Sequence, residues 1–144
     1  MSVEQNKKTA RAFYEAINAK DYDACARMAS SDFVYIPQLG SKLQGIDKFV
    51  AMERANMDPF GDFKMEVKFL AGDGDRFAVY LTFDGVLQEG DTWHGVKVGN
   101  KHMQMDFMTW LHFNEEGKID EKRAKYDTYF ILKRMQAKGL PVLK

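Results

Sequence analysis

A carboxylate near the C-terminus stands where a strand pattern gives way to a helix pattern. Residues 118–127 (KIDEKRAKYD) alternate as expected for a strand, and the following TYFILKRMQAKG carries the apolar stripe of a helix ending near Gly139. Asp127 lies at this junction, where the main chain would hold its side chain rigidly. A fixed carboxylate at the mouth of an apolar pocket is suited to moving a proton on carbon next to a carbonyl group. Asp127 is therefore a candidate acid/base, and an N-cap that only stabilises the helix is an equally common role for such a residue.

The preceding strand supplies polar partners whose positions depend on the register of a hairpin. Residues 101–113 (KHMQMDFMTWLHF) form a long expected strand, and NEEG turns the chain back. A four-residue loop pairs Gln104 with Asp127, a register that we prefer because it sets opposite charges across from each other. The face formed in this way carries Gln104, Asp106, Met108, Trp110, His112, Glu121, Arg123 and Lys125. A three-residue loop with a Gly bulge would instead turn the apolar alternate residues toward Asp127 and leave the polar set on a solvated or interface face.

The polar residues of this face have the types needed for proton transfer without a cofactor. His112, Arg123 and Gln104 are candidate donors to the enolate oxygen that forms when a proton leaves carbon. Arg123 has the alternative role of an ion-pair partner for Asp106 or Glu121. Asp106 is then either a second acid/base or the group that fixes Arg123. The expected catalytic set is Asp127, His112, Arg123 and Asp106.

Aromatic and Met side chains would form the substrate contacts of such a site. The chain has eleven Phe and nine Met, which suits a greasy cavity and equally a Phe-rich core. Trp110 would stack on a flat ring, and Tyr14 and Tyr80 would add hydroxyl groups, although core or wall packing is the commoner role of each. The expected substrate-binding residues are Gln104, Trp110, Met108, Tyr14 and Tyr80.

The spacing of potential ligands predicts neither a metal site nor a cofactor site. His102 and His112 are ten residues apart on one expected strand, a separation of roughly 33 Å, so they cannot share a metal. The third histidine, His94, belongs to no HxxxH motif, and no CxxC, GxGxxG or Walker motif occurs. Cys25 is the only cysteine and has no adjacent histidine, which argues against a disulfide and against covalent cysteine chemistry.

Length and charge limit the class of protein. A chain of 144 residues fits one domain spanning residues 1–144. Its 21 Lys plus Arg balance 21 Asp plus Glu, so nucleic acid is not an expected partner. The first residues lack a hydrophobic signal core, and no apolar run approaches the roughly 20 residues that cross a bilayer. We therefore expect a cytoplasmic protein without a membrane partner.

The elements that must position these residues change from helices to strands along the chain. In chain order they are a helix over residues 3–19 opened by a Ser2/Gln5 capping box, a short helix after Asp21, a strand over 33–36, a helix over 46–56, strands over 63–71 and 76–87, and a glycine-rich loop over 88–101 before the hairpin and the last helix. Segregated helices and strands predict an α+β fold. We expect a strongly curved, mostly antiparallel sheet wrapped around helices as a half-open cone, with an apolar outer face that favours a homodimer.

The order of these segments resembles that of the SnoaL-like polyketide cyclases, within the NTF2-like superfamily. The resemblance rests on ARAFYEAINAKDYDACARMASSDFVY, LQGIDKFVAM, RFAVYLTFDG, WHGVKVGNK and EEGKIDEKRAKYD, in which Gly117 and Asp127 keep the family's spacing. It implies an NTF2-like fold and a cofactor-independent enzyme that uses acid/base chemistry for aldol-type cyclisation or isomerisation of a hydrophobic polyketide- or terpenoid-like molecule. A non-catalytic small-molecule-binding protein and a dimeric interaction module are alternatives on the same fold.

Two segments depart from the pattern of that family. Where the family has Pro-Pro-Thr-Gly before the long strand, this chain has Val96-Lys97-Val98-Gly99. Where a Trp precedes the last Asp by four residues, this chain has Arg123. Both segments border the expected pocket, so we expect a substrate different from that of the commonest members.

Overall fold

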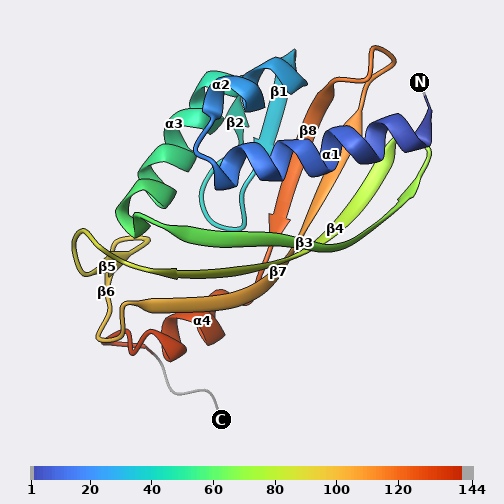
Figure 1. Cartoon of the computed structure of the whole chain (residues 1–144). Helices are drawn as coiled ribbons and strands as arrows, with labels where there is room; N and C mark the ends of the chain where they lie inside the picture. The colour runs from blue at the N-terminus through green and yellow to red at the C-terminus, as the bar shows by residue number, and fades with distance from the viewer. Residues whose placement is uncertain (1, 141–144) are drawn as a thin grey trace.

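The computed structural model describes residues 2–140, which form an α+β fold of helices and one large mixed sheet (Figure 1). The elements are α1 (Val3–Asn18), α2 (Tyr22–Met28), β1 (Ala29–Ile36), β2 (Leu43–Gln44), α3 (Ile46–Met57), a 3₁₀ turn (Asp58–Phe60), β3 (Phe63–Asp73), β4 (Arg76–Val86), β5 (Thr92–Trp93), β6 (Val96–Lys97), β7 (His102–Phe113), β8 (Ile119–Lys125) and α4 (Thr128–Arg134). The expected fold class is confirmed. The last helix ends at Arg134, before the expected Gly139, and the expected glycine-rich loop contains the short β5–β6 hairpin.

The large sheet has the strand order β2-β1-β8-β7-β4-β3 and is strongly curved (Figure 1). Every neighbouring pair is antiparallel except β1 and β8, which run parallel. The pairing slips between Val67 and Phe69 and again between His112 and Phe113. Bulges of this kind increase the local twist of a strand and help a sheet to curl.

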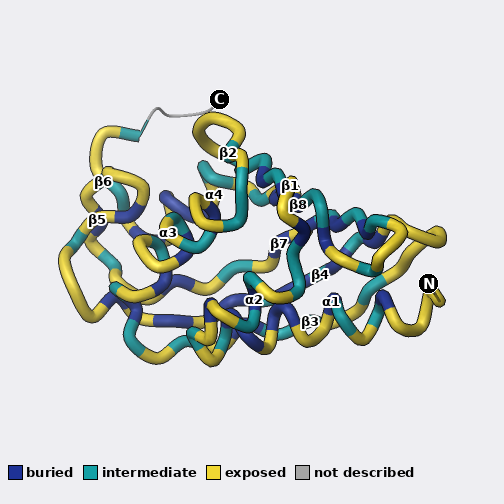
Figure 2. The backbone as a smooth tube through the Cα atoms, turned by 90° about the horizontal axis from the view of Figure 1, so that it is seen from above, coloured by how far each residue is buried: buried dark blue, intermediate teal, exposed yellow. Residues whose placement is uncertain are grey.

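Helix α1 packs across the inner face of the sheet and supplies much of the core. Its N-terminus is capped as the sequence predicts, because the Ser2 hydroxyl accepts a hydrogen bond from the Gln5 amide at 3.0 Å. The apolar stripe Ala10, Phe13, Tyr14 and Ile17 is buried. Figure 2 shows buried segments recurring along α1 and along β4 and β7. The helix therefore closes one side of the hollow that the sheet encloses.

The polar face of β7 points away from the helices, whereas the preferred register was expected to turn it toward the pocket. Its apolar residues Met103, Phe107, Leu111 and Phe113 are buried under the helices, and the alternate residues face outward. Trp110 pairs with Arg123 instead of Glu121, because Phe113 pairs with Ile119 instead of Lys118 and the bulge after His112 moves the register by one more residue. The predicted polar face does form, but it is the outer face of the sheet. Burying so many unpaired charged groups would cost more free energy than burying the apolar set returns.

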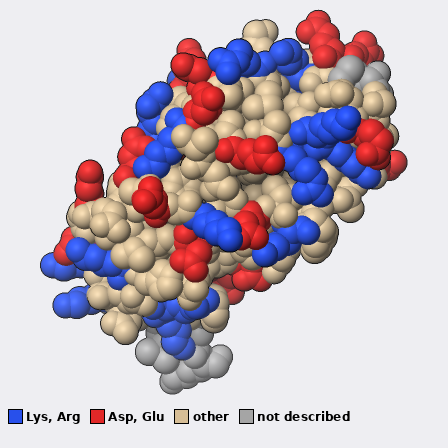
Figure 3. Space-filling view, viewed as in Figure 1, with Lys and Arg blue, Asp and Glu red and all other residues tan. Residues whose placement is uncertain are grey.

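Acidic and basic side chains are interspersed on the face of the molecule that Figure 3 shows, where no extended patch of one sign occurs. Among the helices of residues 2–140, none is long and apolar enough to cross a membrane.

Candidate active site

A cavity of about 70 Å³ lies between the inner face of the sheet and the helices. Most of its wall is apolar and rich in Met and Phe, as the composition suggested. The apolar lining includes Met57, Met65, Phe83, Met103, Met105 and Phe107. Polar side chains reach it from α1, β1, α3 and β8, namely Tyr14, Tyr35, Glu53 and Lys122. A small number of polar groups in an apolar hollow is the usual composition of a site for small molecules.

Glu53 and Lys122 are the charged residues of this cavity that lie deepest. Glu53 is 8% exposed and follows Phe49 by one helical turn on the buried face of α3. Lys122 is 4% exposed and shares the inner face of β8 with Ala124. Among residues 2–140, neither charged group has a hydrogen-bond partner or a close ion pair, although Coulomb attraction couples the two. The fold thus holds two buried ionisable groups beside an apolar cavity, and neither makes a direct ion pair.

The buried environment shifts the pKa of Glu53 and of Lys122 in the direction that favours the uncharged form of each side chain. Burial raises the pKa of the Glu53 carboxyl, and the attraction of Lys122 opposes part of that rise. Burial lowers the pKa of Lys122 to about 8, against the opposing influence of Glu53 and then of Cys25. Groups whose pKa values move toward neutrality can both give and accept protons near physiological pH. Such shifts concentrate at functional sites.

Aromatic rings hold the Lys122 ammonium in place. Its Nζ lies 4.7 Å from the ring centroid of Tyr35, 5.5 Å from that of Phe49 and 5.9 Å from that of Tyr14. Cation–π attraction stabilises the protonated form of Lys122, but the face of an aromatic ring does not accept hydrogen bonds as a carboxylate does. The ammonium donors therefore remain open to a ligand in the cavity.

Tyr14 is the expected substrate-binding residue that the structure does place in the cavity wall. Its hydroxyl shares a short hydrogen bond with Thr109 of β7, and burial raises its pKa. Burial likewise raises the pKa of Tyr35, the next tyrosine along the wall. Both hydroxyls stay protonated at neutral pH and so serve as hydrogen-bond donors.

The β5–β6 hairpin covers the outer end of the cavity. Trp93 is 7% exposed and packs beside Tyr126, with ring centroids 6.1 Å apart. The neighbouring His94 has a positive φ of 49° and places its Nε2 3.3 Å from the Tyr126 hydroxyl. All three side chains line the cavity. The hairpin thus forms part of the cavity wall.

Asp127 does not reach the cavity. Its side chain is exposed and accepts a hydrogen bond from the Phe130 amide at 2.9 Å, which caps α4. The expectation that this carboxylate points into the pocket is wrong, and the N-cap alternative describes its geometry. The junction holds the carboxylate rigidly, as anticipated, but it directs the group at the first turn of the helix.

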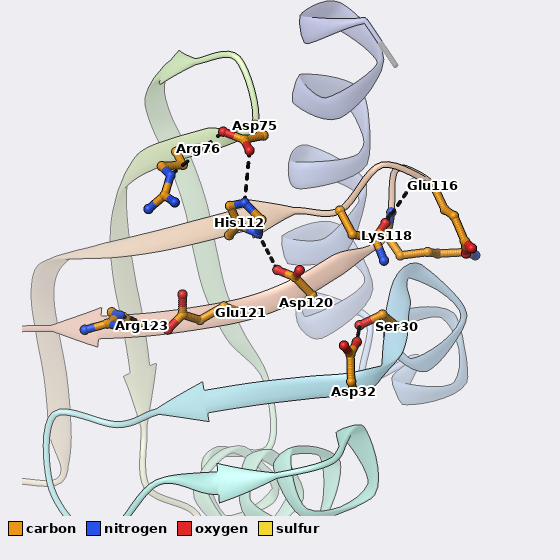
Figure 4. Close-up of polar contacts among 11 residues, drawn as sticks. Ser30, Asp32, Asp75, Arg76, His112, Glu116, Lys118, Asp120, Glu121 and Arg123 are labelled. Carbon is orange, nitrogen blue, oxygen red and sulfur yellow. Dashed lines mark hydrogen bonds and ion pairs between the residues drawn. The ribbon is translucent and has the colours of Figure 1, made fainter.

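His112 lies at the far end of the sheet, bound between two carboxylates (Figure 4). Its Nδ1 lies 2.6 Å from Asp120 Oδ1 and its Nε2 lies 3.0 Å from Asp75 Oδ2. Burial lowers the pKa of His112, but the hydrogen bonds and charges of Asp120 and Asp75 outweigh it, so the net pKa is raised. The imidazole joins the β3–β4 turn to β8 and is not part of the cavity lining.

The remaining members of the expected cluster lie on the outer face of the sheet. Arg123 donates to Glu121 at 2.9 Å, the ion-pair alternative (Figure 4). The guanidinium groups of Arg76 and Arg123 lie 5.4 and 5.3 Å from the centroid of the Trp110 ring. Met108 is 43% exposed beside them. The expectation that these side chains surround the pocket is therefore wrong, because they project from the face of the sheet opposite to the helices.

The same face holds the polar residues nearer the start of β7. Tyr80 donates a short hydrogen bond to Asp106, and Gln104 donates to Asp84 at 2.9 Å. Neither Asp106 nor Gln104 nor Tyr80 lines the apolar cavity. These residues form cross-strand polar pairs that are open to solvent.

We predict that the contacts of His112 with Asp75 and Asp120 make the free energy of unfolding depend on pH. A group with a raised folded pKa stabilises the protein below its unfolded pKa of about 6.5, and this contribution is lost as pH rises through the higher folded value. Replacing His112→Gln should lower the free energy of unfolding by about 1 kcal/mol at pH 5.5 and by less at pH 9. Urea unfolding at the two pH values measures both differences. The matched control is His102→Gln, whose ring contacts the single carboxylate of Asp84. An equal loss at both pH values would contradict the assignment.

Sequence reasoning missed the two central residues, although each carried a signal. Glu53 follows Phe49 and precedes Met57 at the four-residue spacing of one helix face. Lys122 lies two residues before Ala124, a buried apolar residue on the same face of β8. A charged residue at a position where the pattern expects an apolar one is the signal that could have found them.

Comparison with known proteins supports the architecture. The model of the family described as SnoaL-like polyketide cyclase matches residues 7–135. A candidate SnoaL-like polyketide cyclase from Jannaschia sp. CCS1 superposes with a TM-score of 0.81 at 21% identity, covering 98% of each chain. AclR, a candidate hydroxylase from Streptomyces galilaeus, gives 0.78 at 21% identity over 97% of this chain and 100% of its own.

A third solved structure of this fold carries another activity in its name. The LEH-like epoxide hydrolase of M. tuberculosis gives a TM-score of 0.70 at 18% identity, covering 92% of this chain and 85% of its own. No curated protein sequence matches the chain significantly. At such identities the solved structures show the shared fold, whereas the family model spans most of the sequence. The chain belongs to the SnoaL-like polyketide cyclase family.

Proposed function

We propose that the protein is a cofactor-independent acid/base enzyme that acts on a hydrophobic, oxygen-bearing small molecule. One observation supports this above the others: Glu53 and Lys122 are buried without close partners at the same apolar cavity. Burying two ionisable groups in this way costs stability, and a catalytic role explains why the fold keeps them. Membership of a cyclase family agrees with proton-transfer chemistry on carbon.

The chemistry that fits these groups is removal of a proton from carbon next to a carbonyl. In its ionised form the Glu53 carboxylate accepts that proton. The electron pair moves onto the carbonyl oxygen, where the Lys122 ammonium and a tyrosine hydroxyl donate hydrogen bonds to the enolate. The enolate carbon then attacks a second carbonyl of the same molecule, which closes a ring, or it is reprotonated elsewhere, which isomerises the substrate.

The size of the cavity limits which part of a substrate it can enclose. About 70 Å³ is below the roughly 300–1,000 Å³ of most ligand pockets. A polyketide- or terpenoid-like ring system would therefore place only its reacting end beside Glu53 and Lys122. The rest of the molecule would lie outside the cavity.

Two measurements test this function. Native mass spectrometry of the purified protein should show a retained small molecule whose mass identifies the substrate class. With that molecule, Glu53→Gln should lower turnover by roughly 10²- to 10⁴-fold, since a general base is lost. The matched control is Asp127→Asn, which keeps the cap of α4 and should retain turnover. If Asp127→Asn abolishes turnover and Glu53→Gln does not, Asp127 is the acid/base after all. Binding without any turnover would identify a non-catalytic binding protein.

We also propose that the outer sheet face pairs two copies of the chain. The expected broad apolar outer face is wrong, because most side chains on this face are polar. Two apolar side chains are nevertheless exposed there, Phe69 at 55% and Met108 at 43%, and both pair with Tyr80 of β4. Met108→Glu should shift the protein toward monomer in a sedimentation velocity experiment. A wild-type protein that sediments as a monomer at micromolar concentration would refute the homodimer.

A further inference from the structure

Lys122 ends in a buried amine that no carboxylate neutralises at contact distance. Other lysines show what a structural ion pair looks like here: Lys64 and Lys68 approach Glu66 at 2.6 and 2.9 Å. Lys122 makes no such contact with Glu53 or with any other acidic group in residues 2–140, and its ammonium lies 4.7 Å from the centroid of the Tyr35 ring. Simple neutralisation of Glu53 therefore does not account for its position. Its nitrogen lies 4.7 Å from the ring centroid of Tyr35 and 5.9 Å from that of Tyr14, and all three residues line the cavity.

We propose that Lys122 is a nucleophile that forms an imine with a small aldehyde or ketone bound in the cavity. The inference rests on the proposed function, because it uses the same cavity and the same Glu53. The walls of Met and Phe side chains favour a neutral, apolar ligand. The cavity volume of about 70 Å³ admits a carbonyl group with a few carbon atoms attached, which is the part of a substrate that an amine attacks.

The reaction balances with the groups that the cavity supplies. The nitrogen lone pair of neutral Lys122 attacks the carbonyl carbon, and the C=O π electrons move to oxygen, which takes up the proton that nitrogen loses. The resulting carbinolamine loses its hydroxyl as water when the neutral Glu53 carboxyl protonates that oxygen, and the C=N bond forms. No oxidant, reductant or metal is needed.

Burial prepares the amine for this attack. Desolvation by the surrounding core brings the pKa of Lys122 to about 8, and Glu53 and Cys25 raise it less than burial lowers it. The other ionisable groups that face the amine are the hydroxyls of Tyr14 and Tyr35, which burial keeps neutral. At pH 8 about half of Lys122 is neutral, compared with roughly 0.4% of an ordinary lysine. A desolvated lysine in an apolar pocket is a known way to activate an amine.

The imine would also serve the proton transfer proposed above. A protonated C=N bond withdraws electrons from the neighbouring carbon more strongly than a carbonyl group does. The Glu53 carboxylate left after dehydration then faces an acidified C–H bond. Lys122 would thus bind the substrate covalently and act as the electron sink, in place of the noncovalent oxygen stabilisation by its ammonium.

Reductive trapping of the wild-type protein tests the inference directly. Acetone is the probe, because it is a ketone small enough for the cavity, and sodium cyanoborohydride at pH 8 converts any imine into a stable isopropyl amine. Peptide mass spectrometry then compares Lys122 with Lys125, an exposed lysine on the same strand. We expect Lys122 to be modified at least about tenfold faster, in line with its roughly 100-fold larger neutral fraction. Modification of Lys122 no faster than that of Lys125 overturns the proposal, and this comparison needs no variant that might misfold.

One variant separates this inference from the proposed function. Lys122→Arg keeps a cation for oxygen stabilisation but cannot form an imine under these conditions. If imine chemistry operates, Lys122→Arg loses turnover of the retained molecule as fully as Glu53→Gln does. If Lys122→Arg keeps turnover and Glu53→Gln loses it, the imine is wrong and the acid/base function stands. If Lys122 is trapped rapidly but Glu53→Gln turns over normally, the amine is reactive and Glu53 is not the base.

Discussion

Replacing both buried charges, as Glu53→Leu/Lys122→Met, should make the protein more stable and inactive at the same time. Apolar side chains of similar size in place of a buried charged pair often raise the free energy of unfolding, by on the order of 1–4 kcal/mol. The lowered pKa of Lys122 alone corresponds to a penalty of about 3 kcal/mol below pH 8, because the unfolded chain holds that proton more tightly. Chemical denaturation at pH 7 measures the gain, and turnover of the retained molecule measures the loss.

If the two buried charges cause the difference in free energy of unfolding between the double variant and the wild type, that difference should depend on pH. Glu53 has a raised folded pKa, so its penalty grows as pH rises above the unfolded value of about 4.5. Lys122 has a lowered folded pKa, so its penalty is complete below pH 8 and disappears as pH rises from about 8 to 10.5. The gap between variant and wild type should therefore be widest in the pH range between the two folded pKa values. Each single variant should gain less than the pair, since it leaves one buried charge without its partner. A double variant less stable than the wild type at pH 7 would show that the two charges stabilise the fold.

Filling the cavity, as Ala124→Leu, should abolish ligand retention and leave the fold intact. Ala124 is 4% exposed, lines the cavity and lies two residues from Lys122 on the same face of β8. The added carbon atoms enter existing space, so the free energy of unfolding should stay equal or rise by about 1 kcal/mol. Ligand affinity should fall by at least roughly 10- to 200-fold, the effect of one misplaced methylene in a pocket. Isothermal titration with the molecule identified by mass spectrometry measures this loss.

The control for cavity filling is Ala71→Leu. Ala71 is exposed on β3, outside the cavity, so the same substitution there should leave affinity unchanged. Undiminished affinity in Ala124→Leu, with the fold intact, would mean that the ligand binds elsewhere. A loss of stability of about 3 kcal/mol would instead mean that the space beside Ala124 is too small for the added atoms.

The local signals of the sequence were sufficient for the elements and for the family. The Ser2 cap and the stripe through Phe13 and Ile17 produce α1 as expected, because a capping box and a 3.6-residue period act over one or two turns. Residues 46–56 likewise correspond to α3, and the long hairpin of β7 and β8 forms where predicted. These features depend on neighbours a few residues away, and the α+β fold follows from their order.

The site was predicted less well, since it depends on contacts between distant segments. The alternation along β7 correctly separated two sets of residues, but it did not tell which set the helices would cover. Asp127 was correctly placed at the strand–helix junction, and it caps α4 instead of facing the cavity. Tyr14 reached the cavity wall as expected.

Period, caps and turn residues in this chain thus determine its helices, its strands and the kind of fold that they build. Only the packing of α1 and α3 against the curled sheet decided which strand face encloses the hollow, and it brought Glu53 of one segment near Lys122 of another. The reason is physical: capping and periodicity act within a few residues, whereas desolvation of a charge depends on every element that surrounds it.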